Sequence, residues 1–115
     1  MYQDNIINDM LLDFSRQIKA AFADKLCDIV LFGSYARGDF DAESDIDIAI
    51  LADVSREDEH KYSREIVRIT ESIYDVYGYS HVLSPVIINS HTYNEWKDYL
   101  PFYKNVATEG VRIVA

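Results

Sequence analysis

Two short groups of residues near the middle of the chain carry side chains suited to phosphate chemistry. Gly33 and Ser34 close an apolar run, and Asp45 and Asp47 follow after ten intervening residues, where a second apolar run begins. A glycine permits a sharp turn and lets the backbone approach a ligand closely. We expect Ser34 to cap a short helix that starts in SYARG, which would leave backbone N–H groups free to meet a phosphate.

Asp45 and Asp47 are expected to share a divalent cation. Residues two apart on a strand project from the same face, and two carboxylates this close repel each other unless a positive charge lies between them. Carboxylate oxygens suit Mg²⁺, which binds one or two protein carboxylates together with substrate phosphates and water. The alternative is a pair of exposed strand-end aspartates that bond to a neighbouring turn.

The other polar residues of this region leave fewer choices. Arg37 is the one cation between the two groups, and two roles are open for it: contact with a triphosphate oxygen, or an ion pair with Asp39. The alternating acids that start at Asp39 do not form a calcium-binding EF-hand loop, because Ser44 and Ile50 stand where that loop needs glycine and glutamate. The histidines share no spacing typical of a zinc site: His60, His81 and His91.

The acidic balance of the chain limits the kinds of ligand that it can bind. Its formal net charge is -9, from 20 acidic and 11 basic side chains. A protein that grips the backbone of nucleic acid needs a positive face, so the balance disfavours nucleic acid as the main ligand. A basic protein surface, or a nucleotide whose charge metal ions offset, suits it better. The alternative is that the excess acid only keeps the domain in solution.

Length and cysteine content predict the general class of protein. The 115 residues favour a single domain over 1–115. The single cysteine, Cys27, excludes an intramolecular disulfide, favours a reducing compartment and is expected in or near the core. No apolar stretch approaches the roughly 18 residues that span a membrane, so we expect a cytoplasmic protein.

Hydrophobic periodicity predicts the elements that hold the two groups in place. Apolar residues from Ile7 to Phe22 recur at three- and four-residue steps, which indicates a helix. The unbroken apolar run 29–32 before Gly33 is typical of a strand that is covered on both faces. Residues 44–51 alternate, with Ile46, Ile48 and Ile50 on one face and the two aspartates on the other.

The second half of the chain completes a small layered domain. A helix is predicted over 56–77, with a stripe made of Tyr62, Ile66, Ile69, Ile73 and Val76. Gly78 is expected to end it in a left-handed conformation. A third strand follows over 81–89, where Pro85 indicates an edge or a bulge. Two short helices follow, the second ended by Gly110, so the order predicts an α/β or α+β domain with a small mixed sheet flanked by helices.

The segment GSYARGDFDAESDID at 33–47 closely resembles the signature of the DNA polymerase β-type nucleotidyltransferases. Its form, GSxARG…SDID, is that of the minimal nucleotidyltransferases, and the resemblance is specific across residues 29–51. PFYKNVATEG at 101–110 also looks like the ending of a subgroup found beside HEPN-domain toxins. The resemblance implies the polymerase β-like nucleotidyltransferase fold and an antitoxin role.

The resemblance further implies a reaction and a partner. Members of this family transfer AMP from ATP to a tyrosine of the HEPN toxin. Carried over by position, Gly33 and Ser34 hold the triphosphate, and Asp45 and Asp47 bind Mg²⁺ as the catalytic carboxylates. The expected partner is therefore a HEPN-domain toxin, and a homo-oligomer is a further alternative. The toxin motif itself, Arg followed after four to six residues by His, is not matched by Arg56 and His60, which have three residues between them.

One departure from the family pattern affects the expected activity. The family usually adds a third acidic residue on the next strand, which holds a second metal ion. The segment 81–89 has no Asp or Glu, and Ser84 or its neighbour takes that place. Three alternatives follow: the partner supplies a ligand, the chemistry is slow, or the domain is a nucleotide-binding module that neutralises its partner by contact. A further hypothesis, separate from this departure, is a small-molecule nucleotidyltransferase. The last is disfavoured because such enzymes add a helical domain over the acceptor.

Overall fold

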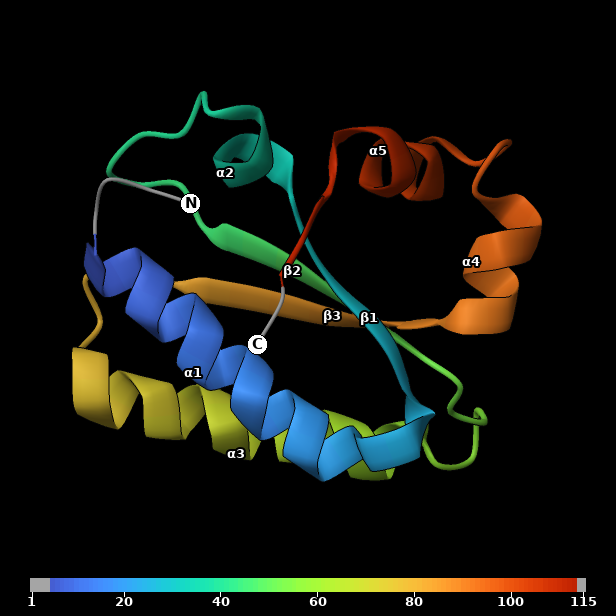
Figure 1. Cartoon of the computed structure of the whole chain (residues 1–115), viewed down its shortest axis with the longest axis horizontal. Coiled ribbons are helices and arrows are strands. Elements are labelled where there is room, and N and C mark those ends of the chain that lie inside the picture. Colours follow the sequence, from blue (N-terminus) through green and yellow to red (C-terminus); the bar gives the residue numbers. More distant parts are fainter. Residues whose placement is uncertain (1–4, 114–115) are drawn as a thin grey trace.

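The computed structural model describes residues 5–113, which form one mixed sheet with helices on both faces (Figure 1). Its strands are β1 (Leu26–Phe32), β2 (Ile46–Ala52), β3 (Leu83–Asn89) and β4 (Val111–Arg112). Their order across the sheet is β3-β2-β1-β4. The pairs β1–β2 and β1–β4 are antiparallel, whereas β2–β3 is parallel. The structure thus confirms the predicted α/β class and the small mixed sheet.

Two long helices, α1 (Asn5–Phe22) and α3 (Glu59–Tyr77), lie side by side across one face of the sheet (Figure 1). Each turns an apolar stripe toward the sheet, as an amphipathic helix must to bury it. Their buried members are Ile7, Met10, Leu11, Phe14, Ile18, Phe22, Ile66, Ile69 and Ile73. These side chains share one core with Ile46, Ile48 and Ile50 of β2, which confirms the predicted isoleucine face.

The opposite face carries three shorter helices and a smaller core. They are α2 (Gly33–Arg37), α4 (Ser90–Trp96) and α5 (Pro101–Glu109). Figure 1 shows α2 and α5 above the sheet and α4 near one end of it. The buried residues of this second core are Val30, Ala49, Leu51, Ile88 and Val106. Strand β2 is therefore covered on both faces, which explains its almost continuous apolar sequence.

The remaining boundaries differ slightly from the predicted ones. A 3-10 turn, η1 (Ala23–Lys25), joins α1 to β1, and α3 begins three residues later than predicted. Gly78 ends α3 at a positive φ of 83°, which favours glycine as predicted, although its ψ of -171° differs from that of a left-handed helical residue. Strand β4 is too short for periodicity to reveal. No helix within 5–113 is both long and apolar enough to span a bilayer.

The prediction that Val76 belongs to the buried stripe of α3 is wrong. Its side chain is 72% exposed. In an α-helix the stripe through Ile69 and Ile73 continues four residues on, at Tyr77, because each residue rotates by about 100°. The Tyr77 hydroxyl accordingly turns toward α1 and donates to Asp13 Oδ2 at 3.3 Å.

The prediction that Cys27 lies in or near the core is also wrong, because its side chain is exposed. The pairing of β1 with β2 shifts register between Leu26 and Asp28, so Cys27 lies at a bulge. At a bulge the alternation of faces is broken, and a residue next to an apolar run can point outward. Sequence alternation alone does not reveal such a shift.

The open edge of β3 is partly closed by a tyrosine. As predicted from Pro85, β3 is an edge strand. Tyr74 of α3 accepts a hydrogen bond from the Leu83 N–H at 2.8 Å, and its hydroxyl lies 3.4 Å from the Leu83 carbonyl oxygen. Pro85, two residues on, has no N–H to offer. Both features reduce pairing at this edge and fix the start of β3, where it lies beside Asp47.

We predict that Tyr74→Phe lowers the free energy of unfolding by about 1–2 kcal/mol, because the Leu83 N–H loses its partner in a half-buried position. Denaturant unfolding measures the change. Tyr79→Phe is the matched control, since the Tyr79 ring packs against Tyr74 with 4.8 Å between centroids but is itself 73% exposed. The control should change stability by less than about 0.5 kcal/mol. Equal losses in both variants would contradict the role of the Tyr74 hydroxyl.

Candidate active site

The two groups singled out from the sequence lie at the same end of the sheet. Strand β1 ends at Phe32, whose Cα lies opposite that of Asp47, and α2 starts at the next residue. On the other side of β2, Ser84 is the register partner of Asp47. Side chains of paired residues share a face of the sheet. Asp47 is thus flanked by Phe32 and Ser84, on the face that carries α2 and α5.

Gly33 is in direct contact with the Asp47 side chain. Its φ is +74°, a backbone conformation that favours glycine. A Cβ atom at this position would overlap Asp47 Oδ2. No other residue type could therefore stand here without moving the carboxylate. The turn after β1 and the start of β2 form one site, although fourteen positions separate Gly33 from Asp47 in the sequence.

Ser34 does not cap the helix as expected. Helix α2 begins at Gly33, its N-cap residue is Phe32, and no side chain caps it. Ser34 therefore lies within the first turn, where its carbonyl oxygen accepts from the N–H groups of Gly38 and Asp39 at 2.9 and 3.1 Å. Its hydroxyl has no hydrogen-bond partner among residues 5–113, so it is free to bind a ligand.

Arg37 joins α2 to α5. Its Nε donates to Asp39 Oδ2 at 3.2 Å and its Nη1 donates to Glu109 Oε2 at 3.3 Å. These bonds to Asp39 and Glu109 raise the pKa of the guanidinium. The predicted pair with Asp39 is confirmed, whereas Glu109, 72 positions away, left no signal in the sequence. The other role predicted for Arg37, contact with a triphosphate, stays a prediction.

Asp45 and Asp47 are two neighbouring negative charges, and within residues 5–113 no positively charged side chain is paired to either. Asp45 is exposed just before β2, and Asp47 is half-buried. Burial raises the pKa of Asp47, the negative charge of Asp45 raises it further, and the positive charge of Arg37 lowers it in part. Neither carboxylate bonds or pairs with a side chain of the described range. Among residues 5–113 neither carboxylate accepts a hydrogen bond from a backbone N–H either, so no bond to a neighbouring turn supports the alternative.

This donor set fits a divalent cation that also binds phosphate. Two unpaired carboxylates offer hard oxygen ligands. A cation between them would offset the burial of the Asp47 charge and its repulsion by Asp45, which together raise the pKa of Asp47. No cluster of three His, Cys, Asp or Glu side chains that could hold a metal occurs within 5–113. The remaining ligands would have to come from substrate oxygens and water, as is usual for Mg²⁺.

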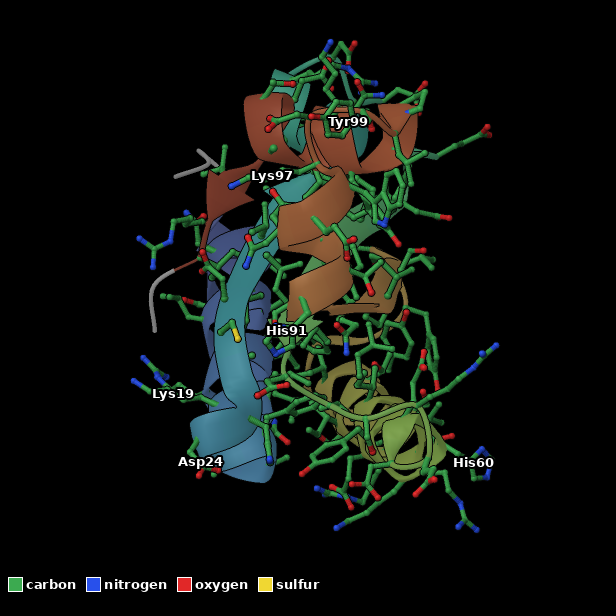
Figure 2. The ribbon with its side chains drawn as sticks, turned by 90° about the vertical axis from the view of Figure 1, so that its right-hand side faces the viewer. Lys19, Asp24, His60, His91, Lys97 and Tyr99 are labelled. Atoms are coloured by element: carbon green, nitrogen blue, oxygen red, sulfur yellow. The ribbon has the colours of Figure 1, made fainter. Side chains whose placement is uncertain are left out.

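Of the other side chains considered as metal ligands, Asp41 bonds within the loop before β2 and His91 lies at the opposite end of that strand. Asp41 accepts from the Glu43 N–H at 2.9 Å and its own N–H donates to Ser44 Oγ at 2.9 Å, so this part of the loop is held by its own turn. His91, in the first turn of α4 (Figure 2), has its Nε2 atom 3.2 Å from Oδ1 of Asp53. Asp53 follows the last residue of β2, at the end of that strand opposite to Asp47. These residues are therefore separate from the carboxylate pair.

The chain is similar to several known proteins. The model of the nucleotidyltransferase domain family matches residues 15–108. A relative from Methanocaldococcus jannaschii, named "putative protein adenylyltransferase", is 40% identical over 81 residues, which are 70% of this chain and 78% of the relative. Two more proteins of that organism with the same description are 35% and 32% identical over 88 and 98 residues.

Two solved structures resemble the chain. A "putative nucleotidyltransferase" from Sulfolobus solfataricus has a TM-score of 0.54 at 18% identity, over 96% of this chain and 87% of that one. A toxin–antitoxin structure with AMP-PNP has a TM-score of 0.48 at 20% identity, over 96% and 72% of the two chains. The Sulfolobus structure confirms the nucleotidyltransferase fold predicted from the sequence.

The raised pKa of Asp47 predicts an effect on stability. A carboxyl whose pKa is raised by folding binds its proton more tightly in the folded chain. Stability therefore falls as the pH rises from the unfolded value of about 4 to the folded value, and it stays lower above that. We predict that Asp47→Asn raises the melting temperature at pH 7 by a few degrees at most, since the group is partly solvated.

The pH dependence distinguishes this effect from a general gain in packing. The difference between Asp47→Asn and the wild type should disappear at pH 3, measured by thermal unfolding in low salt. Asp45→Asn should give a smaller gain at pH 7, because it relieves the repulsion but not the burial. Melting temperatures that coincide for wild type and Asp47→Asn at every pH would contradict the claim that the charge of Asp47 destabilises the folded chain.

Proposed function

The chain belongs to the nucleotidyltransferase domain family, and from this membership we propose that it transfers AMP from ATP to a hydroxyl of a partner protein. The relatives named as protein adenylyltransferases support a protein acceptor. The observation that carries the proposal is the contact of Gly33 with the Asp47 carboxylate, beside a second unpaired carboxylate. A turn suited to phosphate beside a carboxylate pair suited to a cation fits a ligand whose phosphate groups bind a divalent cation, as those of ATP do.

The reaction is an in-line displacement at phosphorus. The acceptor oxygen forms a bond to the α-phosphorus of ATP, and the bond from that phosphorus to the oxygen bridging to the β-phosphate breaks. Pyrophosphate leaves with the electron pair, and the acceptor proton passes to solvent. Catalysis of such a step depends mostly on positioning and on charge neutralisation.

The chain's own residues do the positioning. Gly33 allows the backbone to approach the triphosphate, and the free Ser34 hydroxyl donates to a phosphate oxygen. Asp45 and Asp47 hold Mg²⁺, which when bound neutralises charge on the phosphates. Arg37 can turn from Glu109 toward a phosphate, because both of its ion pairs are exposed and cost little to break.

The partner that we propose is a HEPN-domain toxin, to which this chain acts as antitoxin. The resemblance of the segment 101–110 to that subgroup supports the choice. The net charge of -9 suits a basic protein surface and repels nucleic acid. Adenylylation of a toxin tyrosine would explain neutralisation without permanent occupancy of the toxin by the antitoxin.

A second candidate function follows from the missing carboxylate. Ser84 lies beside Asp47 on β3 and is a far weaker metal ligand than an aspartate. A domain with one well-held ion can bind a nucleotide and still turn over slowly. In that case it neutralises its partner by contact, as a nucleotide-binding module.

We predict that label from α-³²P-ATP appears on a cognate HEPN-domain toxin when the two purified proteins and Mg²⁺ are mixed. Asp45→Asn and Asp47→Asn should each lower the labelling rate at least about 100-fold, because each removes a ligand of the ion. Asp53→Asn, at the far end of β2, is the control and should label normally. If neither wild type nor Asp47→Asn transfers label and both neutralise the toxin equally, the contact-only function is correct.

We also predict that Ser84→Asp raises the labelling rate about tenfold or more, because a third carboxylate beside Asp47 would hold a second ion. Without Mg²⁺ the same variant should unfold at a lower temperature, since three carboxylates then repel one another. Ser80→Asp, which adds the same charge at an exposed position before β3, controls for charge alone. An unchanged labelling rate in Ser84→Asp would mean that this position does not limit turnover.

A further inference from the structure

An exposed aromatic side chain lies next to the carboxylate pair. Phe32 shares a sheet face with Asp47, and the ring of Phe102 meets the Phe32 ring edge to face, with 5.5 Å between centroids and 88° between planes. Phe102 is in the first turn of α5 and is 47% exposed. A large apolar ring is thus left in solvent beside the proposed phosphate site.

Further contacts locate Phe102 over the middle of the sheet. Its ring centroid lies 5.7 Å from that of Tyr103. Tyr103 in turn lines a hollow with Ile88 and Asn89, at the far end of β3. Phe102 therefore lies between the end of β1 and the end of β3, on the same face as Asp47.

The sheet face that carries Asp47 also includes an exposed apolar side chain on β3. Val86 alternates with Ser84 and Ile88 along β3, so all three side chains share the face of Asp47. Val86 is 36% exposed, whereas Ile88 is buried under the short helices. Besides Phe102, the face of Asp47 thus presents the apolar side chain of Val86 to solvent.

Residues other than Phe102 anchor α5 to the rest of the protein. Val106, one turn further along the helix, is 1% exposed and belongs to the core between α5 and the sheet. The ion pair of Glu109 with Arg37 fixes the other end of the helix. Phe102 covers only part of Phe32 and leaves much of its own surface free.

We propose that Phe102, which packs against Phe32, is the surface on which the base of the nucleotide stacks. The inference rests on the proposed function, because the triphosphate at Gly33 and Asp47 brings the base to this face. Aromatic rings bind bases through their faces, without reading hydrogen bonds. The platform therefore accepts any nucleobase and favours the larger purines.

The test compares ATP with inorganic tripolyphosphate, which has the phosphates but no base. Dissociation constants are measured by calorimetry with Mg²⁺ for the full chain. Wild type should bind ATP more tightly than tripolyphosphate. Phe102→Ala should weaken ATP binding about tenfold or more and leave tripolyphosphate binding within about twofold. Phe102→Trp, which keeps a ring, should bind ATP like wild type and guards against a loss that comes from misfolding.

Tyr99→Ala is the matched control. Tyr99 is an aromatic residue that is 74% exposed on the connection from α4 to α5 (Figure 2), and its ring packs against Trp96. It should bind ATP like wild type. Phe102→Ala with unchanged ATP affinity, or with equal losses for ATP and tripolyphosphate, would overturn the platform. Wild type that binds neither compound would instead overturn the proposed function.

Discussion

The contact between the Gly33 backbone and the Asp47 carboxylate is the constraint on which the rest of this structure depends. It needs a residue without a Cβ at positive φ, immediately after a buried strand. It also needs an antiparallel neighbour whose register sets Asp47 opposite the end of that strand. Such a register is held only if a slip would expose a hydrophobic face. Ile46 and Ile48, both fully buried on either side of Asp47, supply that penalty.

The larger hydrophobic core and the candidate site lie on opposite faces of the sheet. The face under α1 and α3 holds most of the buried apolar side chains and includes both long helices. The opposite face has a core of only five buried residues, and its helices are short. A half-buried carboxylate with a raised pKa can be accommodated there because the first face contributes most of the hydrophobic stabilisation. The candidate site thus lies on the face with the smaller core, and the stability of the fold around it depends on the larger core of the other face.

Sequence periodicity predicted the elements with long, regular patterns and missed features that depend on a single contact. The stripe of α1 and the alternation of β2 recur over many residues, so one exception does not hide them. Strand β4 has two residues, and the bulge at Cys27 is one shift in a ladder. The Arg37–Glu109 pair joins residues that no local pattern connects. For the site, the sequence predicted which side chains carry charge, but the neighbours that raise the pKa of Asp47 depend on packing.

The absence of an acidic side chain at Ser84 also has a structural meaning. A third carboxylate beside Asp47 would be repelled by Asp45 and Asp47 whenever no ion is bound, on the sheet face that has the smaller core. A serine at this position keeps the empty site at two carboxylates, whose charge a single divalent cation can balance. On the proposed function, the serine leaves this chain without a third carboxylate to hold a second ion. If the proposed transfer is fast, the partner must supply the missing ligand, and the enzyme is then complete only in the complex with that partner.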